Sequence, residues 1–453
     1  MSDFDPTGPM KQNGRKKIYS PRHWAQKIVS IQNRDASWAL TDQLLISGLS
    51  FIIGIVIART VGIAEFGRIA IVILLAAQAL TIQDNFLAAP MMTLVGRRAR
   101  RTASYFGAVL AWGVILSIAS GIAVAAIVST LFLLRDGSVS PSFGLAAFLV
   151  TAAQSIHSTV RRLFFAQRRF GLALAVDAAR YVGLLLIILV LGSAPGITRV
   201  DAPLILFTMA ACVLISAGIY GLFTERPRLR WRLMSKVITR HWPIARWLVL
   251  MVIASAGQDQ LVPLAITLLL GDAALGGLRA GQYLVGSTHF ILMGMGNFVP
   301  QRAAEAYVVG ASEGLRKYLI KETIVFGVPT VLLLLIIGVW AEFWLGHLFG
   351  PEYVIYSPIL RIYCLTYFAI YLRDILIYYL RSIERTRATF DASAISSLVT
   401  IVLVYPLVWY AGLLGAALVV LAANITSLGC ILAEVRRQHV LGLDRSLDYS
   451  APL

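Results

Sequence analysis

The chain has 453 residues, of which 58% are apolar and only 14% charged, and its mean hydropathy is +0.76. A soluble protein of this size needs far more polar surface, so the composition argues against a soluble enzyme and predicts an integral membrane protein. The net charge of +17 is then no sign of a nucleic-acid partner, because Lys and Arg gather on the cytoplasmic side of membrane proteins and set their orientation.

The first 38 residues are polar and basic, and we expect them to form a cytoplasmic tail. Apolar stretches then follow at regular intervals, each long enough to cross a bilayer as a helix. The last two stretches are divided only by Ala411-Gly412-Leu413, because a single helix there would be about twice as long as a bilayer requires. The predicted spans are 39–58, 69–93, 105–133, 142–165, 172–192, 203–223, 246–270, 281–300, 323–345, 357–380, 392–411 and 413–433.

The basic residues indicate how these twelve spans are oriented. Of the 40 Lys and Arg residues, 32 lie in the tails and in every second connection, whereas five lie in the connections between. This asymmetry places both termini in the cytoplasm, and dropping one span would invert every later loop. The five residues assigned to outward connections are Arg59, Arg68, Arg135, Arg199 and Arg279.

A short glycine pattern occurs twice. Gly62-Ile-Ala-Glu-Phe-Gly67 follows the first span and Gly271-Asp-Ala-Ala-Leu-Gly276 follows the seventh, 209 residues later. Each is followed by an apolar helix that ends in proline. We therefore predict an all-α fold of two six-helix lobes, related as parallel repeats about an axis along the membrane normal. The predicted units are the tail 1–38, the N-lobe 39–223, a cytoplasmic linker 224–245, the C-lobe 246–434 and the cytoplasmic tail 435–453.

The segment Ile57-Ala-Arg-Thr-Val-Gly-Ile-Ala-Glu-Phe-Gly-Arg-Ile-Ala70 resembles the first turn of bacterial polysaccharide flippases of the MOP exporter superfamily, with Val61 in place of their usual leucine. The resemblance is clear over roughly 60 residues, and beyond them it rests on the plan of spans. It implies a V-shaped two-lobe transporter of the inner membrane that flips a lipid-linked oligosaccharide for polysaccharide biosynthesis. The two extra helices of the fourteen-helix peptidoglycan-precursor flippases have no counterpart here.

Ionisable residues inside spans are costly and are therefore the first candidates for function. Arg180 lies about eight residues into the fifth span, roughly 12 Å deep. Its guanidinium suits the pyrophosphate of a polyprenyl-linked sugar, because it can bind phosphate oxygens in pairs. Asp177 lies on the same helix face, so the alternative is a structural Asp177–Arg180 pair that neutralises itself.

The tenth span contains two further arginines. Arg373 and Asp374 point about 100° apart on a helix, so we expect them not to neutralise one another. Arg373 is a second candidate for the pyrophosphate, and Arg361, near the outer end, is a third. For both arginines the alternative is a side chain that reaches back to the membrane interface.

Three acidic residues in or near other spans are candidates for ion coupling, together with Asp177 and Asp374. Asp259 precedes Pro263 by four residues, so its own carbonyl lacks an amide partner, and carboxylate and carbonyl together suit a hard cation or a proton. Asp84 lies in a similar polar cluster of the second span. Asp42 lies close to the inner end of the first span, where an interfacial position is the alternative. Helix packing is the alternative for Asp259.

Three tyrosines form one stripe along the tenth span, at intervals of four residues. Tyr363, Tyr367 and Tyr371 can stack on sugar rings and bond their hydroxyls, which makes them candidates for the saccharide. The alternative is helix packing, in which buried hydroxyls still need partners. Gly277 and Gly281 indicate close packing between helices.

The sequence contains no recognised catalytic motif. There is no Walker A sequence and no hydrolase or zinc-protease signature, so we expect no enzyme activity, no cofactor and no metal centre. Cys212, Cys364 and Cys430 are expected to be buried thiols.

We expect a secondary transporter that works by alternating access, with Na⁺ or H⁺ as candidate coupling ions. Its expected partners are the lipid-linked oligosaccharide, membrane lipids and glycan-assembly proteins. A multidrug exporter of the same superfamily, a membrane-embedded enzyme of glycan polymerisation and a non-transporting scaffold remain as alternatives.

Overall fold

The computed structural model describes residues 41, 43, 45–97, 103–193, 200–223 and 231–440. Within these ranges the chain is helical and contains no strand, which confirms the predicted all-α class. An apolar helix, Leu45–Val61, comes first. The other elements are α2 (Ile63–Gln83), the π-helix η1 (Asp84–Ala88), α3 (Ala89–Arg97), α4 (Ala103–Asp136), α5 (Pro141–Ala166), α6 (Phe170–Ser193), α7 (Ala202–Phe223), α8 (Trp231–Leu269), α9 (Asp272–Gly286), α10 (His289–Val339), α11 (Ala341–Leu348), the 3₁₀-helix η2 (Pro351–Tyr356), α12 (Ser357–Ser382) and α13 (Thr386–Val440).

Two of these helices change direction within their length. α10 does so at Gly310 and Ala311, and α13 does so at Gly412, whose φ is 57°. A φ in this range suits glycine and breaks the helical path, so the predicted division at Gly412 is confirmed. Seven of the described helices are long and apolar enough to cross a membrane, and three shorter apolar helices accompany them. The count of twelve spans stays a prediction.

The two glycine turns begin α2 and α9. Gly62 has φ 79° and Gly271 has φ 86°, a conformation that L side chains rarely adopt. Each glycine therefore ends one helix and lets the next begin at once, at Ile63 and at Asp272. The sequence prediction began these two spans at 69 and 281, which was too late. Arg68 and Arg279 consequently lie within helices and not in connections.

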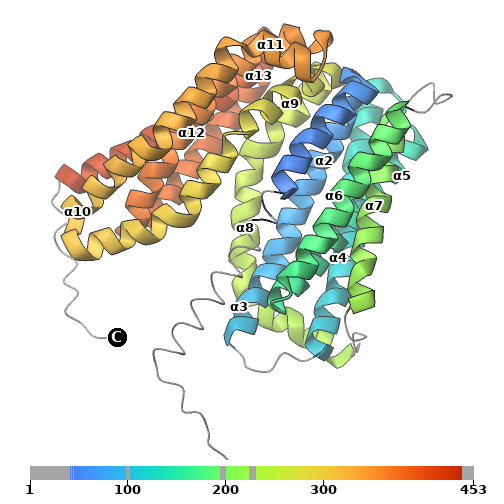
Figure 1. The fold of residues 1–453 in the computed structure, drawn as a ribbon, viewed down its shortest axis with the longest axis horizontal. Coiled ribbons are helices and arrows are strands. Elements are labelled where there is room, and N and C mark those ends of the chain that lie inside the picture. The colour runs from blue at the N-terminus through green and yellow to red at the C-terminus, as the bar shows by residue number, and fades with distance from the viewer. Residues whose placement is uncertain are drawn as a thin grey trace, which may run out of the picture.

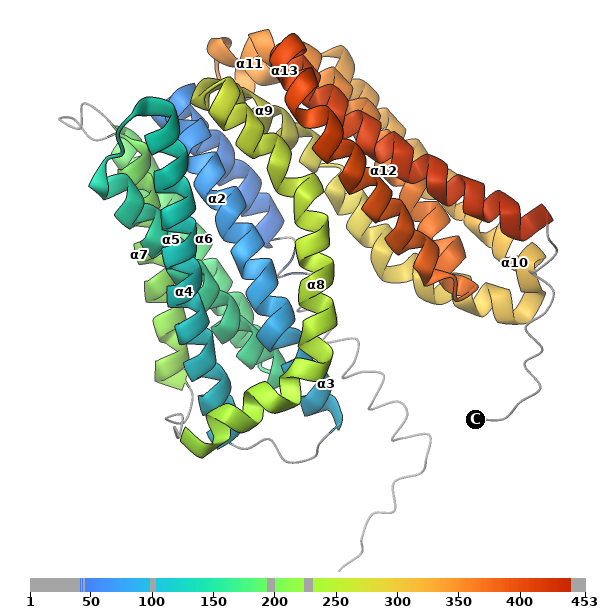
Figure 2. The same cartoon turned by 180° about the vertical axis from the view of Figure 1, so that it is seen from behind.

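The helices form two groups that meet at one end and separate toward the other (Figures 1 and 2). We call Leu45–Val61, α2 and α4 to α7 the first group, and α10, α12 and α13 the second group. We call the end at which the groups meet the narrow end, and the opposite end the wide end. One hydrophobic cluster joins the two sides at the narrow end. It contains Phe66 and Ile205 from the first group, Leu345 from α11 and Leu360 from α12. Two further clusters, one around Phe164 and one around Tyr371, are each confined to one side.

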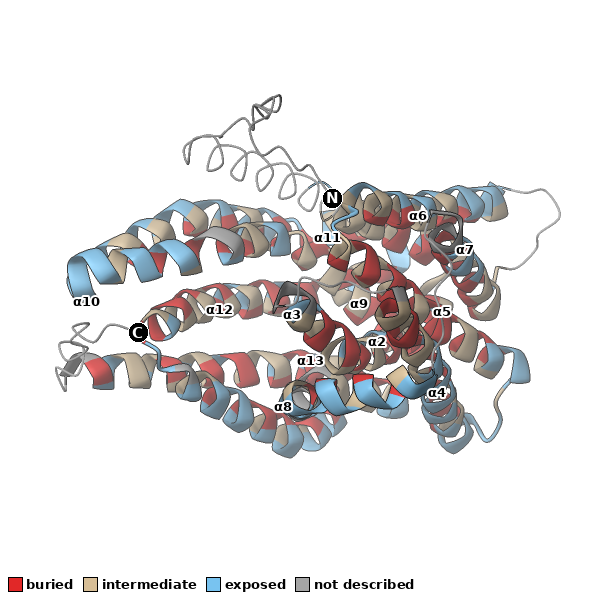
Figure 3. Ribbon diagram, turned by 90° about the horizontal axis from the view of Figure 1, so that it is seen from below, coloured by how far each residue is buried: buried red, intermediate tan, exposed pale blue. Residues whose placement is uncertain are grey.

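The outer faces of both groups are apolar. Ile118 and Ile122 on α4 and Ile324 and Leu335 on α10 are each more than 40% exposed. Figure 3, seen from the wide end, shows exposed residues along α4 and α10 and buried residues where α2 and α9 lie. A soluble protein rarely exposes apolar surface on this scale, whereas a lipid bilayer covers it.

α8 lies between the groups and packs against α2 and α4 on one side and α13 on the other (Figure 2). Its first part, before Pro243, lies across the wide end of the first group. There Trp112 donates from Nε1 to the carbonyl of Met234 at 3.0 Å, and Tyr105 bonds His241 at 2.9 Å. The division into an N-lobe, a linker at 224–245 and a C-lobe stays a prediction.

Candidate functional site

A cavity of about 450 Å³ lies where the two groups separate. We call it the central cavity. Its walls come from Leu45–Val61, α2, α8, α9, α10 and α12. The lining side chains include many polar groups, namely Ser47, Ser50, Gln260, Arg279, Gln282, Tyr283, Ser287, His289 and Tyr367, beside apolar ones such as Phe51, Phe290 and Met293.

A smaller cavity of about 200 Å³, which we call the side cavity, extends into the first group. It shares Ser50, Arg279 and Tyr283 with the central cavity, and it is otherwise lined by residues of Leu45–Val61, α2, α5, α6 and α7. Its polar lining includes Arg180 of α6 and Gln154 of α5, and both have a buried nitrogen without a hydrogen-bond partner. The two cavities therefore present one continuous set of donors around Arg279.

Arg279 is held in α9 without a carboxylate. Its Nη1 donates to Gln282 Oε1 at 2.8 Å, and its guanidinium carbon lies 5.6 Å from the ring centre of Tyr283. Its Nε is buried and has no acceptor. Gln282 in turn donates to the hydroxyl of Tyr363 at 3.0 Å, which fixes the amide. The arginine is thus positioned while most of its donors stay free for a ligand.

Arg180 does not pair with Asp177. The carboxylate of Asp177 bonds Arg161 at 2.5 Å and lies 3.5 Å from His157, both on α5. Arg180 instead lines the side cavity and lies 4.8 Å from the ring centre of Tyr181. The self-neutralising Asp177–Arg180 pair, left open by the sequence, is therefore wrong. The physical reason is that Asp177 is buried against α5, where Arg161 satisfies it.

The described residues that line the two cavities include no Asp or Glu. The guanidinium groups of Arg279 and Arg180 therefore have no carboxylate partner among the described ion pairs. A partly buried charge without a partner is costly, and an anionic ligand would remove that cost. Asp259 precedes the cavity residue Gln260 in α8, but its side chain lies outside the described residues, as does all of Asp42.

The remaining candidates lie apart from the cavities, except Tyr367, which lines the central one. Tyr363 reaches it through Gln282, whereas Tyr371 donates to the carbonyl of Thr323 at 2.6 Å within the second group. Tyr371 therefore has a helix-packing partner.

Arg373 pairs with Asp374 at 2.9 Å and also donates to Asn424 at 3.1 Å. The expectation that these neighbours do not neutralise one another is therefore wrong, because the long arginine side chain folds back to reach the carboxylate beside it. Arg361 pairs with Glu342 at 3.1 Å on the surface, where both side chains are largely exposed. Neither arginine lines a described cavity.

Asp84 also has a cationic partner. It begins the π-helix η1, accepts from Ser158 at 2.9 Å and pairs with Arg162 at 3.1 Å. Three candidate coupling residues, Asp84, Asp177 and Asp374, therefore each form an ion pair with an arginine in this structure. The buried Gln83 beside it bonds Ser117, the carbonyl of Ser155 and Thr159.

Sequence reasoning missed Arg279 because the apolar window of the eighth span began after it. The glycine repeat could have indicated its position. If a helix begins directly after Gly62, the equivalent Gly271 predicts that the next helix begins at residue 272, which places Arg279 inside it. His289, Gln282 and Gln260 carry no comparable signal in the sequence.

Comparisons with known proteins agree with this geometry. The family model described as MatE matches residues 248–406, about a third of the chain. No curated protein sequence matches the chain. An inward-facing multidrug resistance MATE family transporter of the MOP superfamily is 12% identical, with a TM-score of 0.71 over 89% of this chain and 96% of that one.

Two further solved structures share the fold. The lipid II flippase MurJ in an inward closed conformation is 14% identical, with a TM-score of 0.65 over 88% of this chain and 87% of that one. A multidrug resistance MATE family transporter in the outward-facing conformation gives a TM-score of 0.55 at 12% identity, over 91% of this chain and 93% of that one. The chain therefore has the fold of MOP superfamily transporters, and it resembles the inward-facing form more than the outward-facing one.

Proposed function

We propose that this protein is a secondary transporter of the MOP type that flips a polyprenyl-pyrophosphate-linked oligosaccharide across the bacterial inner membrane. The observation that carries the proposal is the pair of arginines, Arg279 and Arg180, at cavities whose described lining has no acidic residue. A pyrophosphate is the part of such a substrate that is most costly to move through a membrane. Guanidinium groups match its oxygens better than any other side chain.

The remaining lining suits the rest of such a substrate. Tyr367, Gln282 and Gln260 offer hydroxyl and amide groups to a saccharide, and Tyr283 offers a ring face beside Arg279. The lipid tail would stay between the two helix groups at their open end, where apolar surface faces the bilayer. The substrate would enter from the wide end, which the basic residues predict to be cytoplasmic, and alternating access would release it at the other side.

Multidrug export is the second candidate, and the fold favours it as much as it favours flipping, since multidrug MATE transporters share the architecture. The charge of the cavity separates the two. A cationic drug would be repelled by Arg279 and Arg180 and would find no carboxylate among the described lining residues. The proposal of an anionic substrate rests on this contrast.

Coupling to Na⁺ or H⁺ remains part of the proposal, with Asp259 as its main candidate. Asp84, Asp177 and Asp374 each hold an arginine, so a coupling role would require that arginine to be displaced. Arg361, Arg373, Tyr371 and Asp42 stay candidates only for states of the transporter in which they are differently placed.

The test is flipping by the purified protein in proteoliposomes. A fluorescent polyprenyl-pyrophosphate-linked saccharide would be added, and its exposure would be followed with a membrane-impermeant glycosidase. We expect Arg279→Gln and Arg180→Gln to reduce the rate at least about tenfold, because each removes a charge-assisted bond to the phosphates. Arg279→Lys should retain part of the activity, since it keeps the charge and loses the planar fork.

Arg316→Gln is the control, because it also removes an arginine charge but from an exposed position outside the described cavities. Flipping that is unchanged in both cavity variants would overturn the anionic site. Efflux of a cationic dye without any flipping would move the function to multidrug export. In cells that lack the gene, lipid-linked repeat units that reach the outer face but stay unpolymerised would favour a polymerising enzyme.

A further inference from the structure

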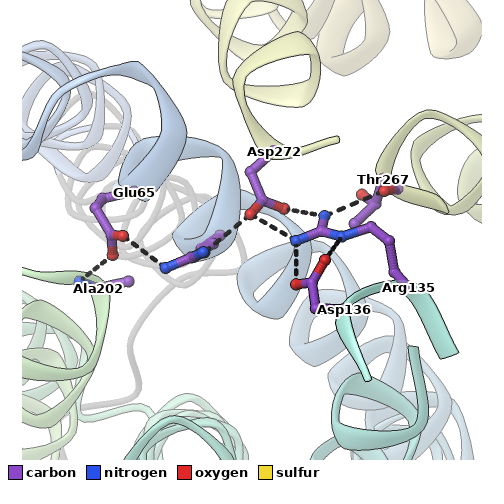
Figure 4. Close-up of polar contacts among 7 residues, drawn as sticks. Glu65, Arg135, Asp136, Ala202, Thr267 and Asp272 are labelled. Atoms are coloured by element: carbon purple, nitrogen blue, oxygen red, sulfur yellow. Dashed lines mark hydrogen bonds and ion pairs between the residues drawn. The ribbon is translucent and has the colours of Figure 1, made fainter. Parts of the chain in front are cut away.

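The narrow end of the molecule is held by ion pairs between the two repeats. Asp272, the first residue of α9, accepts from Arg68 Nε of α2 at 2.8 Å. It also accepts from Nη1 and Nη2 of Arg135, at the end of α4, at 2.6 and 3.0 Å. Figure 4 shows the carboxylate between the two guanidinium groups. The side chain of Asp272 is only 6% exposed, so these bonds are shielded from water.

The two arginines also have carboxylates of their own. Arg68 bonds Glu65 at 2.7 Å within α2, and Arg135 bonds the neighbouring Asp136 at 2.7 Å. If Asp272 moved away, each arginine would therefore keep a partner, whereas Asp272 would lose both of its described cations. The carboxylate of Asp272 is the element on which the connection depends.

Beneath these ion pairs, the two glycine turns of the sequence repeat pack directly on one another. A Cβ on Gly67 would collide with the backbone oxygen of Asp272, and a Cβ on Gly276 would collide with the backbone oxygen of Ile63. Gly67 and Gly276 are equivalent in the repeat, and so are Ile63 and Asp272, so the contact is symmetric. The two backbones meet directly at these glycines, and Phe66 of α2 packs near Tyr283 of α9 beside them, with ring centres 6.1 Å apart.

Few other polar bonds cross this end. Glu352, in η2, accepts from the backbone N–H of Ile63 at 3.1 Å, and Arg59 donates to the carbonyl of His347. Both of these bonds are exposed, so water can replace them at little cost. A third bond, from the buried hydroxyl of Tyr353 to the carbonyl of Ala58, is long at 3.4 Å. The shielded, charge-assisted bonds to Asp272 are therefore the strongest polar connection at this end, among the described residues, between the first group and α9.

We propose that Asp272 is the latch of an outer gate: its bonds to Arg68 and Arg135 hold the glycine joint closed and keep the cavity open toward the wide end. This inference rests on the proposed alternating-access function and adds the residue that sets its conformational balance. The outward-facing state must separate α9 from α2 and α4. Loss of the latch should therefore favour that state.

The experiment measures the width of this end directly. Spin labels would be placed at Ser138Cys, after α4, and at Ile355Cys, in η2, which are both exposed. The three natural cysteines would be replaced, and the distance distribution would be recorded by double electron–electron resonance in nanodiscs without substrate. Asp272→Asn removes the latch and leaves Arg68 and Arg135 paired. We expect it to raise the population with the longer distance about tenfold.

Asp272→Glu should keep most of the short-distance population, because the carboxylate remains. Arg361→Gln is the control, since it breaks another ion pair of this end, one that does not connect the two groups. If Asp272→Asn does not fold, Arg135→Gln removes two of the three bonds and leaves Arg68 on the carboxylate, and it should give a smaller shift.

A distance distribution that is unchanged in the folded Asp272→Asn protein would overturn the latch, as would an equal shift in Arg361→Gln. The measurement needs no substrate, so its outcome is independent of the proposed flipping activity. A protein that opens as expected but flips no lipid would retain the latch and lose the proposed function.

Discussion

At the scale of single residues, the ion-pair partners distinguish charged side chains that pack the helices together from those that line a cavity. Asp177 and Arg180 lie three positions apart on α6, yet the acid bonds Arg161 while the arginine lines the side cavity. Their side chains are offset by about 60° around the helix, which is enough to point them at different neighbours. Asp177 thus belongs to the packing of α5 against α6, and Arg180 belongs to the cavity.

We therefore expect substitutions at these two positions of α6 to affect different quantities, stability at one and flipping at the other. Asp177→Asn should lower the free energy of unfolding by about 3 kcal/mol, because Arg161 loses its partner within a buried contact. Arg180→Gln should change stability by less than about 1 kcal/mol and reduce flipping instead. Thermal denaturation in detergent, run beside the flipping assay, measures both quantities. A large loss of stability in Arg180→Gln with normal flipping would assign that arginine to packing.

At the scale of elements, the two glycine turns explain how α2 and α9 can cross so closely. Gly67→Ala should force the turns apart, because its methyl group would meet the backbone of Asp272 and no flexible side chain can give way. We expect a loss of about 1–3 kcal/mol in stability and, on the spin-labelled pair, a wider narrow end. Gly183→Ala is the matched control within α6, where a Cβ would meet nothing within 4 Å. Equal behaviour of the two variants would contradict the close joint.

The elements themselves were largely predictable, because about 20 apolar residues in a row leave a helix as the main solution in lipid. The repeat also indicated that the turns at Gly62 and Gly271 are equivalent. Their mutual contact was not predictable, since a pattern in the sequence carries no information on which copies touch.

The candidate site was predicted only in part. Depth in a span identified Arg180, but it also selected Arg361 and Arg373, which the structure pairs with acids. The hydropathy pattern placed Arg279 in a connection, because a charged residue near the end of a span lowers the mean hydropathy of the stretch that contains it. Whether an arginine is free depends on side chains that come from other helices, and no local pattern encodes them.

At the scale of the whole molecule, the shape and the distribution of charge support different parts of the proposed function. The fold is shared with multidrug transporters and with the flippase MurJ, so shape alone leaves the substrate open. The positions of Arg279 and Arg180 are the reason for proposing an anionic substrate. Arginine positions also distinguish the two ends, because the narrow end contains the ion pairs of Asp272 while the wide end leads to the cavity.

The direction of transport depends on which end faces the cytoplasm, and labelling of single cysteines measures it. The distribution of basic residues predicts that the narrow end lies outside. Ser138Cys and Ile355Cys should then react with a membrane-impermeant maleimide in intact cells, whereas Glu313Cys and Glu384Cys should react only after permeabilisation. All four positions are exposed, so burial cannot account for a difference. The reverse pattern would place the cavity's opening outside and turn the proposed flippase into an importer.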